Sequence, residues 1–196
     1  MGWTESTAMF HNKDGSVNRK AECDYYFEGG LNRGFYKLIA SAMKGSTYYA
    51  AAMPLYEYVK NPDGTETKQP VPENERKVYG FVFLTYVKKG RFGYKPMSED
   101  MGPGESACPR SVLKHLSPTD NKWAQEWRER CEKNFSLERL GKLPIGTKIR
   151  FTKGGRTITL QKHAAAYQFK KPFWMNTDEF SYFSKKNIPG NYEIVK

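Results

Sequence analysis

Val78-Tyr-Gly-Phe-Val-Phe-Leu-Thr-Tyr-Val87 is the strongest strand signal in the chain, because it is rich in β-branched and aromatic residues. Successive side chains of a strand point to opposite faces of a sheet, and in this run both sets are mostly large and apolar. The two sets are Tyr79, Phe81 and Phe83 on one face and Val82, Leu84 and Tyr86 on the other. The run therefore predicts the central strand of a sheet that is covered on both sides.

Two further strand-like runs precede this central strand. Residues 35–43 and 46–59 are rich in aromatic and small apolar residues, and the turn signal between them predicts a hairpin. Pro54 has no N–H to donate to a neighbouring strand, which predicts an edge or a bulge at that point. Residues 60–76 are polar and rich in proline, and they predict a long mobile connection. Together the three runs predict an antiparallel three-stranded sheet.

Helices are predicted on both sides of these strands. Asn18 suits the N-terminal cap of a helix over residues 18–27, and Pro109 suits the first turn of a short helix that ends near residue 116. Residues 88–107, between the central strand and the short helix, are rich in glycine, proline, lysine and methionine. We expect them to form a second long loop.

The third predicted helix has the clearest start signal. Ser117-Pro-Thr-Asp120 supplies a serine cap, a proline at the first helical position and an acid three residues after the cap. We expect the helix to end near residue 135. Trp123, Trp127 and Cys131 recur every four residues, which predicts one apolar stripe.

The last third of the chain reads as a series of short strands. Residues 147–152 and 156–162 flank Lys153-Gly-Gly155 and predict a hairpin. Three more short strand-like runs follow, and five such strands with tight turns suggest a small SH3-like β-barrel. The runs are residues 166–174, 180–183 and 192–195. The predicted fold class is α+β, with an α+β domain over residues 1–140 and a small barrel-like basic unit over residues 141–196.

Positive charge is concentrated in that last unit. The chain has 32 lysines and arginines and 21 acidic residues, a formal net charge of +11. Residues 141–196 alone hold 11 basic and three acidic residues, a net charge of +8. An asymmetry of this size bears on the partners of a protein rather than on its fold. It marks the last third as the anion-facing part of the chain.

Basic and aromatic residues interleave in this segment as they do in nucleic-acid-binding proteins. Lysines and arginines displace counterions from phosphates, and aromatic rings stack on bases. Strand alternation predicts that Lys148 and Arg150 project together from one face. The predicted nucleic-acid-binding residues are Lys148, Arg150, Arg156, Lys162, Lys170, Lys171, Lys185 and Lys186, and the predicted stacking residues are Tyr167, Trp174 and Tyr182. The alternative is that the aromatic residues fill a small core and that the lysines are its solvated exterior.

A second basic group follows the central strand. Lys88, Lys89 and Arg91 lie around Gly90, on a predicted loop that can reach a phosphate backbone. The order of a helix, three strands and a further helix also resembles, by order alone, a double-stranded RNA-binding domain. We include these three residues among the predicted nucleic-acid-binding residues.

Several segments of the chain resemble a family of uncharacterised proteins, a domain of unknown function, carried by bacterial phages and conjugative elements. The matching stretches are Met1-Gly-Trp3, Arg19-Lys-Ala-Glu-Cys-Asp24, Met101-Gly-Pro103, Cys108-Pro109, Pro118-Thr-Asp120, Glu126-Trp-Arg128, Leu143-Pro-Ile-Gly146 and Ala166-Tyr-Gln-Phe-Lys170. The resemblance implies an accessory protein of a mobile element, a class that includes inhibitors of host defence such as anti-CRISPR and anti-restriction proteins. It implies no catalytic residues.

The expected partner is RNA, DNA or a host nucleoprotein effector, bound without catalysis. A metal-dependent nuclease and a protein-binding module without nucleic-acid contact are the two alternatives. Cys23, Cys108 and Cys131 lack the spacing of a zinc site or a disulfide framework, so no cofactor or metal is predicted. The chain contains no long apolar run and no apolar segment near its start, which predicts a cytoplasmic protein without a membrane span.

Overall fold

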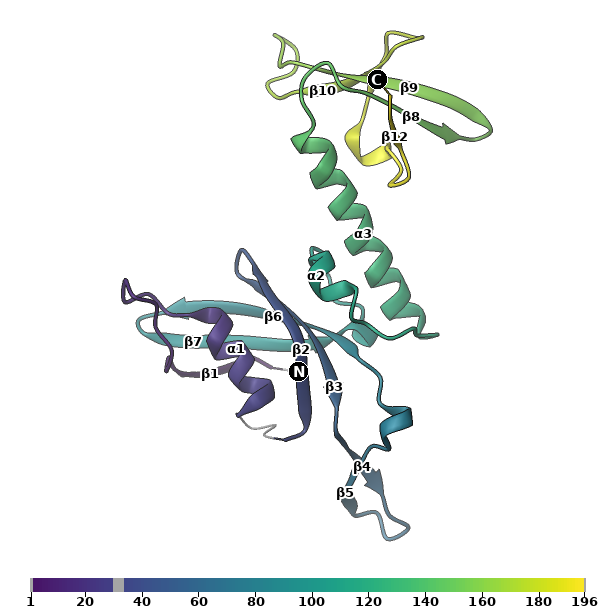
Figure 1. Ribbon diagram of the computed structural model, residues 1–196. Helices are drawn as coiled ribbons and strands as arrows, with labels where there is room; N and C mark the ends of the chain where they lie inside the picture. Colours follow the sequence, from purple (N-terminus) through teal and green to yellow (C-terminus); the bar gives the residue numbers. More distant parts are fainter. Residues whose placement is uncertain (1, 30–33, 196) are drawn as a thin grey trace. The chain divides into compact units, whose positions relative to one another are not determined.

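Figure 1 shows a computed structural model of the chain, in which residues 2–29 and 34–195 are described. The chain divides into two units, residues 1–131 (unit 1) and 132–196 (unit 2). The boundary lies inside helix α3 (Lys122–Lys142), whereas the sequence predicts a boundary after residue 140. The first half of α3 therefore belongs to unit 1, and its last turns belong to unit 2.

Unit 1 is built on an antiparallel sheet of five strands, in the order β1-β7-β6-β3-β2. The strands are β1 (Thr4–Thr7), β2 (Tyr36–Lys44), β3 (Thr47–Pro54), β6 (Tyr79–Lys88) and β7 (Arg91–Ser98). The predicted central strand is β6, in the middle of the sheet, and the predicted hairpin is β2–β3. The sheet thus has two strands more than the three predicted, β1 and β7.

β7 is the main element that the sequence does not reveal, because glycine and proline interrupt it. Gly93 is the direct partner of Tyr86 on β6, and a Cβ added to it comes within 2.3 Å of the Tyr86 ring. A larger residue at this position would force the Tyr86 ring to move. Pro96 lies beyond the residues that pair with β1, so β7 is an edge strand there and tolerates a residue without an N–H.

The predicted mobile connection is partly a hairpin. The second strand run divides at Leu55 into β3 and β4 (Tyr56–Lys60), and β4 pairs with β5 (Glu66–Pro70) in a separate two-stranded sheet. The short 3₁₀ helix η1 (Glu73–Glu75) then leads to β6. Lys68 on β5 lies 4.2 Å from the centre of the Tyr56 ring, a cation–π contact that supports the hairpin.

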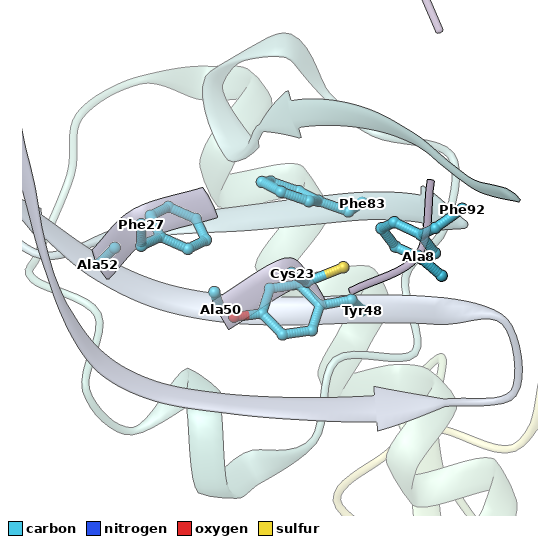
Figure 2. Close-up of a cluster of buried hydrophobic side chains, with 8 residues drawn as sticks. All are labelled: Ala8, Cys23, Phe27, Tyr48, Ala50, Ala52, Phe83 and Phe92. Carbon is cyan, nitrogen blue, oxygen red and sulfur yellow. The ribbon is translucent and has the colours of Figure 1, made fainter. Parts of the chain in front are cut away.

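α1 (Arg19–Glu28) covers one face of the unit 1 sheet. The side-chain oxygen of Asn18 accepts a hydrogen bond from the Ala21 N–H at 3.0 Å, so the predicted cap is present. Cys23 and Phe27 of the helix pack against Tyr48 of β3 and Phe83 of β6 (Figure 2). This aromatic core replaces the aliphatic residues that the composition lacks.

The other face of the sheet is covered by α2 (Arg110–Leu113) and the first half of α3. Trp127 and Cys131 of α3 pack against Val82 of β6, as the predicted stripe requires. Trp123, predicted in the same stripe, is instead 61% exposed. β3 serves both cores, and its small alanines at 50–52 allow close packing on each face.

α3 begins later and ends later than predicted. Its N-terminal cap is Asn121, whose side-chain oxygen accepts from the Ala124 N–H at 3.0 Å. Ser117, the predicted cap, instead accepts from the Val78 N–H at 2.9 Å, just before β6. The helix continues to Lys142 because Leu140 enters the core of unit 2, which a local signal does not show.

Within the described residues, no helix has the length and apolarity to cross a membrane.

Unit 2 contains a second antiparallel five-stranded sheet, in the order β11-β10-β9-β8-β12. Its strands are β8 (Lys148–Lys153), β9 (Arg156–His163), β10 (Phe173–Asn176), β11 (Tyr182–Phe183) and β12 (Glu193–Val195). Five strands occur in the described residues, but the third is β10 at 173–176 instead of the predicted 166–174, because residues 166–169 form a turn. The edge strands β11 and β12 do not pair in the described residues, so the sheet is open and the predicted SH3-like barrel does not form. Ile149, Leu160 and Trp174 form its core with Leu140.

Candidate nucleic-acid interface

Unit 2 contains a cavity beside strands β10 and β11. Its volume is about 550 Å³, within the range of about 300–1,000 Å³ typical of ligand pockets. The β9–β10 connection, the two strands and the start of the 3₁₀ helix η3 (Lys185–Asn187) supply most of its lining. Every charged side chain in the lining is a lysine. The predicted site residues found there are Lys162, Lys170, Lys171, Trp174, Tyr182 and Lys185.

Three rings of the cavity lining stack with a histidine. The His163 and Phe173 rings lie 5.5 Å apart at an interplanar angle of 19°, and the Phe173 and Phe169 rings lie 4.3 Å apart at 29°. Phe169 in turn stacks on Tyr182, with ring centres 4.9 Å apart and planes at 15°. These are the separations of favourable stacked pairs. We call His163, Phe173, Phe169 and Tyr182 the aromatic ladder.

Strand register and a tight turn assemble the aromatic ladder. Phe173 on β10 is the direct partner of His163 on β9, and Tyr182 lies on the adjacent strand β11. In the β9–β10 connection, Ala166 and Phe169 exchange backbone hydrogen bonds of 3.0 and 2.8 Å. This turn brings Phe169 back onto the rings of the two strands. The ladder thus depends on residues from four segments: β9, the β9–β10 connection, β10 and β11.

The cavity lysines differ in how free their charges are. Lys170 and Lys171 are exposed. Partial burial, followed by the charge of Lys162, lowers the pKa of Lys185 from the ordinary lysine value of 10.5, and Glu138 acts in the opposite direction. An anion bound beside Lys185 relieves this repulsion. Lys170, Lys171 and Lys185 are therefore the cations of the cavity that can meet a phosphate.

Lys162 has a structural role instead. Its side chain is 7% exposed, and its ammonium donates hydrogen bonds to the backbone oxygens of Gly141, at 2.9 Å, and Leu143, at 2.5 Å. These carbonyls lie at the end of α3, where backbone oxygens lack helical partners and a positive charge is favourable. The sequence prediction of an outward-facing Lys162 is thus corrected: this cation caps the helix.

Replacing Lys162 with methionine is expected to lower the free energy of unfolding of unit 2 by about 1–3 kcal/mol, because both carbonyls lose a charged donor. Hydrogen exchange in the β8–β9 peptides measures this loss. The folded variant should keep the salt dependence of nucleic-acid binding, since the lost charge was already paired within the protein. A lower salt dependence combined with unchanged exchange would instead assign Lys162 to the binding surface.

A row of directly opposed residues crosses the sheet from the cavity to β8. Tyr182 is the partner of Met175, Met175 of Gln161, and Gln161 of Lys148. Opposed residues in antiparallel strands project from the same face, so Lys148 and Arg150 share the face of Tyr182. Three strand spacings separate the ends of the row, roughly 14 Å. The predicted pair on β8 is therefore on the same side as the aromatic ladder.

Arg156 lies on the other side of this sheet. It is the partner of Lys153, and strand alternation places it with Ile158 and Leu160, which contribute to the core. The predicted grouping of Arg156 with Lys148 and Arg150 is therefore wrong. Lys186 is exposed in η3, directly after Lys185.

The predicted stacking residues separate into three environments. Tyr182 is 54% exposed at the end of the aromatic ladder. Trp174 is 3% exposed in the core, so it supports the cavity wall and does not offer a face for stacking. Tyr167 is fully exposed at the tip of the β9–β10 turn, outside the cavity lining. The core interpretation holds for Trp174, and the stacking interpretation is retained for Tyr182.

Phe169 and Phe173, two of the aromatic residues that interleave with the lysines in the sequence, complete the site together with His163, which the sequence does not indicate. Their spacing along the chain gives no signal, because Phe169 lies in a turn and the other two are on different strands. The stack becomes apparent only in the structure, where the strand register makes His163 and Phe173 direct partners.

The second predicted basic group lies in unit 1. Lys88 and Arg91 are partners at the ends of β6 and β7, and Lys89 and Gly90 form the turn between them. The start of the predicted long loop is thus a tight turn, and β7 follows it. Arg91 pairs with Glu5 on β1 at 3.1 Å, which partly neutralises it. Lys88 and Lys89 remain exposed.

Cys23, one of the three cysteines, lies in the core of unit 1. Cys23 is 1% exposed, and burial raises the pKa of its thiol, which disfavours the reactive thiolate. Within residues 2–29 and 34–195, no group of three or more histidine, cysteine and acidic side chains is arranged to hold a metal ion.

Compared with protein-family models, curated proteins and solved structures, the chain finds no match.

Proposed function

We propose that this protein binds nucleic acid through the cavity of unit 2 and does not act on the nucleic acid as an enzyme. The observation that carries the proposal is the juxtaposition of the aromatic ladder with Lys170, Lys171 and Lys185 around one cavity. Stacking rings and cations together match the two components of a nucleotide, its base and its phosphate. A simple core with a solvated exterior explains Trp174 but leaves the exposed Tyr182 ring unexplained.

Electrostatics supports an extended polyanion as the ligand. Lys148 and Arg150 lie on the same face as Tyr182, so a strand that leaves the cavity meets further positive charge. Glu193 on β12 is the direct partner of Arg150 and moderates the charge at the far edge. Because phosphate binding releases counterions, the affinity of such a surface falls steeply as salt rises.

Replacing Lys170 and Lys171 together with glutamine is expected to reduce this salt dependence. Two lost phosphate contacts lower the slope of log K against log salt by about 1.4 for a single strand or about 1.8 for a duplex. Fluorescence anisotropy of the full-length protein with labelled oligonucleotides, over a series of salt concentrations, gives the slope. The matched control is Lys60→Gln with Lys114→Gln, two exposed lysines of unit 1 outside the predicted binding residues, which should leave the slope unchanged.

Equal losses in the two double variants would show a general effect of net charge and contradict the proposed site. No binding of RNA or DNA by the wild-type protein at low salt would reject the function itself. Excess polyglutamate is the competitor that separates phosphate recognition from simple polyanion binding. It should displace less ligand than unlabelled nucleic acid at the same charge concentration.

We further propose that the nucleic acid belongs to a host defence complex. The resemblance to proteins of phages and conjugative elements supports this setting, and the net charge of +11 suits contact with a guide RNA better than imitation of DNA. Copurification from a host lysate with and without nuclease treatment tests it. A partner that is lost on nuclease treatment supports a nucleoprotein held through its nucleic acid, whereas a retained partner favours direct protein contact.

A further inference from the structure

The last ring of the aromatic ladder has a face available to a ligand. Phe169 stacks on one face of Tyr182, at 4.9 Å and 15°, yet the Tyr182 side chain is 54% exposed. A ligand can therefore reach the part of Tyr182 that Phe169 does not cover. Phe169 and Phe173 support the ring from behind, so it is held in place before a ligand binds. Such preorganisation lowers the entropy lost on binding.

The surroundings of this ring match one nucleotide unit. The cavity of about 550 Å³ has an aromatic wall, which suits the flat face of a base. Lys170, Lys171 and Lys185 also line the cavity, and these cations suit phosphates on either side of the base. The amide of Gln168, which also lines the cavity, can donate to or accept from the edge of a base.

The pairing state of the base decides whether it can reach Tyr182. In a duplex each base is covered on both faces by its neighbours, so it contacts a protein ring only when it is unpaired or turned out of the stack. Exposed lysine side chains, by contrast, contact the phosphates of the nucleic acid and therefore attract single strands and duplexes alike. A stacking platform inside a cationic cavity thus favours single strands.

We propose that the cavity takes up an unpaired base of single-stranded nucleic acid, which stacks on Tyr182 while neighbouring phosphates contact Lys170 and Lys171. The inference rests on the proposed function and names its substrate class. It applies to RNA and DNA equally, because both present the same aromatic faces and phosphates.

Anisotropy titrations of the full-length protein test the inference with three labelled ligands. These are a single strand of about 12 nucleotides, the duplex of the same sequence, and the same strand with abasic sites, each made as RNA and as DNA where the chemistry allows. The wild-type protein should bind the intact single strand more tightly than either the duplex or the abasic strand. This preference in either the RNA or the DNA series supports the proposal.

Variants of Tyr182 separate stacking from charge. Tyr182→Ala should weaken binding of the intact single strand between about 5-fold and about 140-fold, the effect of losing one base–ring stack. Tyr182→Phe keeps the ring and should stay within about twofold of the wild type. Tyr58→Ala removes a 62% exposed tyrosine on β4 of unit 1, outside the predicted binding residues, and serves as the matched control. Duplex affinity should be unchanged in all three variants.

Equal affinity of the wild-type protein for intact and abasic strands overturns the proposal, and this comparison needs no variant to fold. A preference for the duplex in both series also overturns it. Loss of binding to all ligands, at low salt and in the wild-type protein, would instead reject the proposed function. If binding persists and Tyr182→Ala has no larger effect than Tyr58→Ala, the charge site stands and the stacking site is rejected.

Discussion

Replacing Arg128 with methionine is expected to lower the free energy of unfolding of unit 1 by about 3–5 kcal/mol. Arg128 on α3 donates to both carboxylate oxygens of Glu99, each at 2.7 Å, and to the Ser117 backbone oxygen at 2.7 Å. Glu99 lies in the 3₁₀ helix η2 (Glu99–Met101) and is 1% exposed. Without the guanidinium, its carboxylate is left buried with no opposing charge from Arg128.

The surroundings of the Arg128–Glu99 pair explain why water does not easily take the place of Arg128 beside the Glu99 carboxylate. Glu99 also accepts from the Gly80 N–H at 2.9 Å, in the central strand. A Cβ on Gly80 would lie 3.2 Å from the Glu99 carboxylate and 3.0 Å from the Trp127 ring, so a larger residue at this point of β6 would have to displace them. Glu99 thus links β6, η2 and α3 through one buried group.

Hydrogen exchange in the peptides of β3 and β6 measures the effect of Arg128→Met, because their slowest amides open with the whole unit. Lys122→Met is the matched control on the same helix. Its ion pair with Glu126, at 4.0 Å, is exposed, and such pairs contribute about 0–1 kcal/mol. Adding Glu99→Gln to Arg128→Met should restore part of the loss, because no unpaired charge remains. Equal effects of Arg128→Met and Lys122→Met would contradict a structural role for the buried pair.

Phe27→Ala is expected to destabilise unit 1 by about 3–5 kcal/mol, the usual cost of emptying a large aromatic site. Phe27 is 0% exposed and lies among the residues of the core under α1 (Figure 2). Its ring centre is 5.4 Å from that of Phe83 and 5.3 Å from that of Phe81, so several ring pairs are lost together. Few aliphatic side chains are nearby to fill the space.

Urea unfolding followed by exchange in unit 1 tests Phe27→Ala, with Tyr25→Ala as control. Tyr25 lies on the same helix and is 40% exposed, so its loss should cost less than about 1 kcal/mol. Peptides of β8 and β9 should keep their exchange rates in both variants, because they belong to the other unit. Faster hydrogen exchange in both units would show instead that the two units unfold together, and the effect of Phe27→Ala would then belong to the whole chain.

Local sequence patterns were enough to place several elements. The run that became β6 is apolar at both alternating sets of positions, and such a strand is stable only between two layers. Asn18 marks the start of α1 because an asparagine side chain can accept from a free helical N–H. Glycine pairs mark the β8–β9 turn because few other residues tolerate its backbone angles. Each of these signals acts over a few neighbouring residues.

Other elements depended on partners distant in the chain. β7 forms across Gly93 and Pro96 because the Tyr86 ring covers the glycine and the proline falls on an edge. Asn121 rather than Ser117 begins α3, since the serine is engaged by the strand that packs beside it. The intrinsic preference of a residue for helix or strand is weak, and such tertiary contacts override it.

The candidate site divides in the same way. Composition alone showed that residues 141–196 are basic and aromatic, because charge and ring content add up whatever the fold. Which lysine faces a ligand and which caps a helix was decided by the tertiary structure, which buries Lys162 against the end of α3. The aromatic ladder likewise exists only through strand register and one turn, since stacking requires rings a few ångströms apart and sequence distance does not determine that separation.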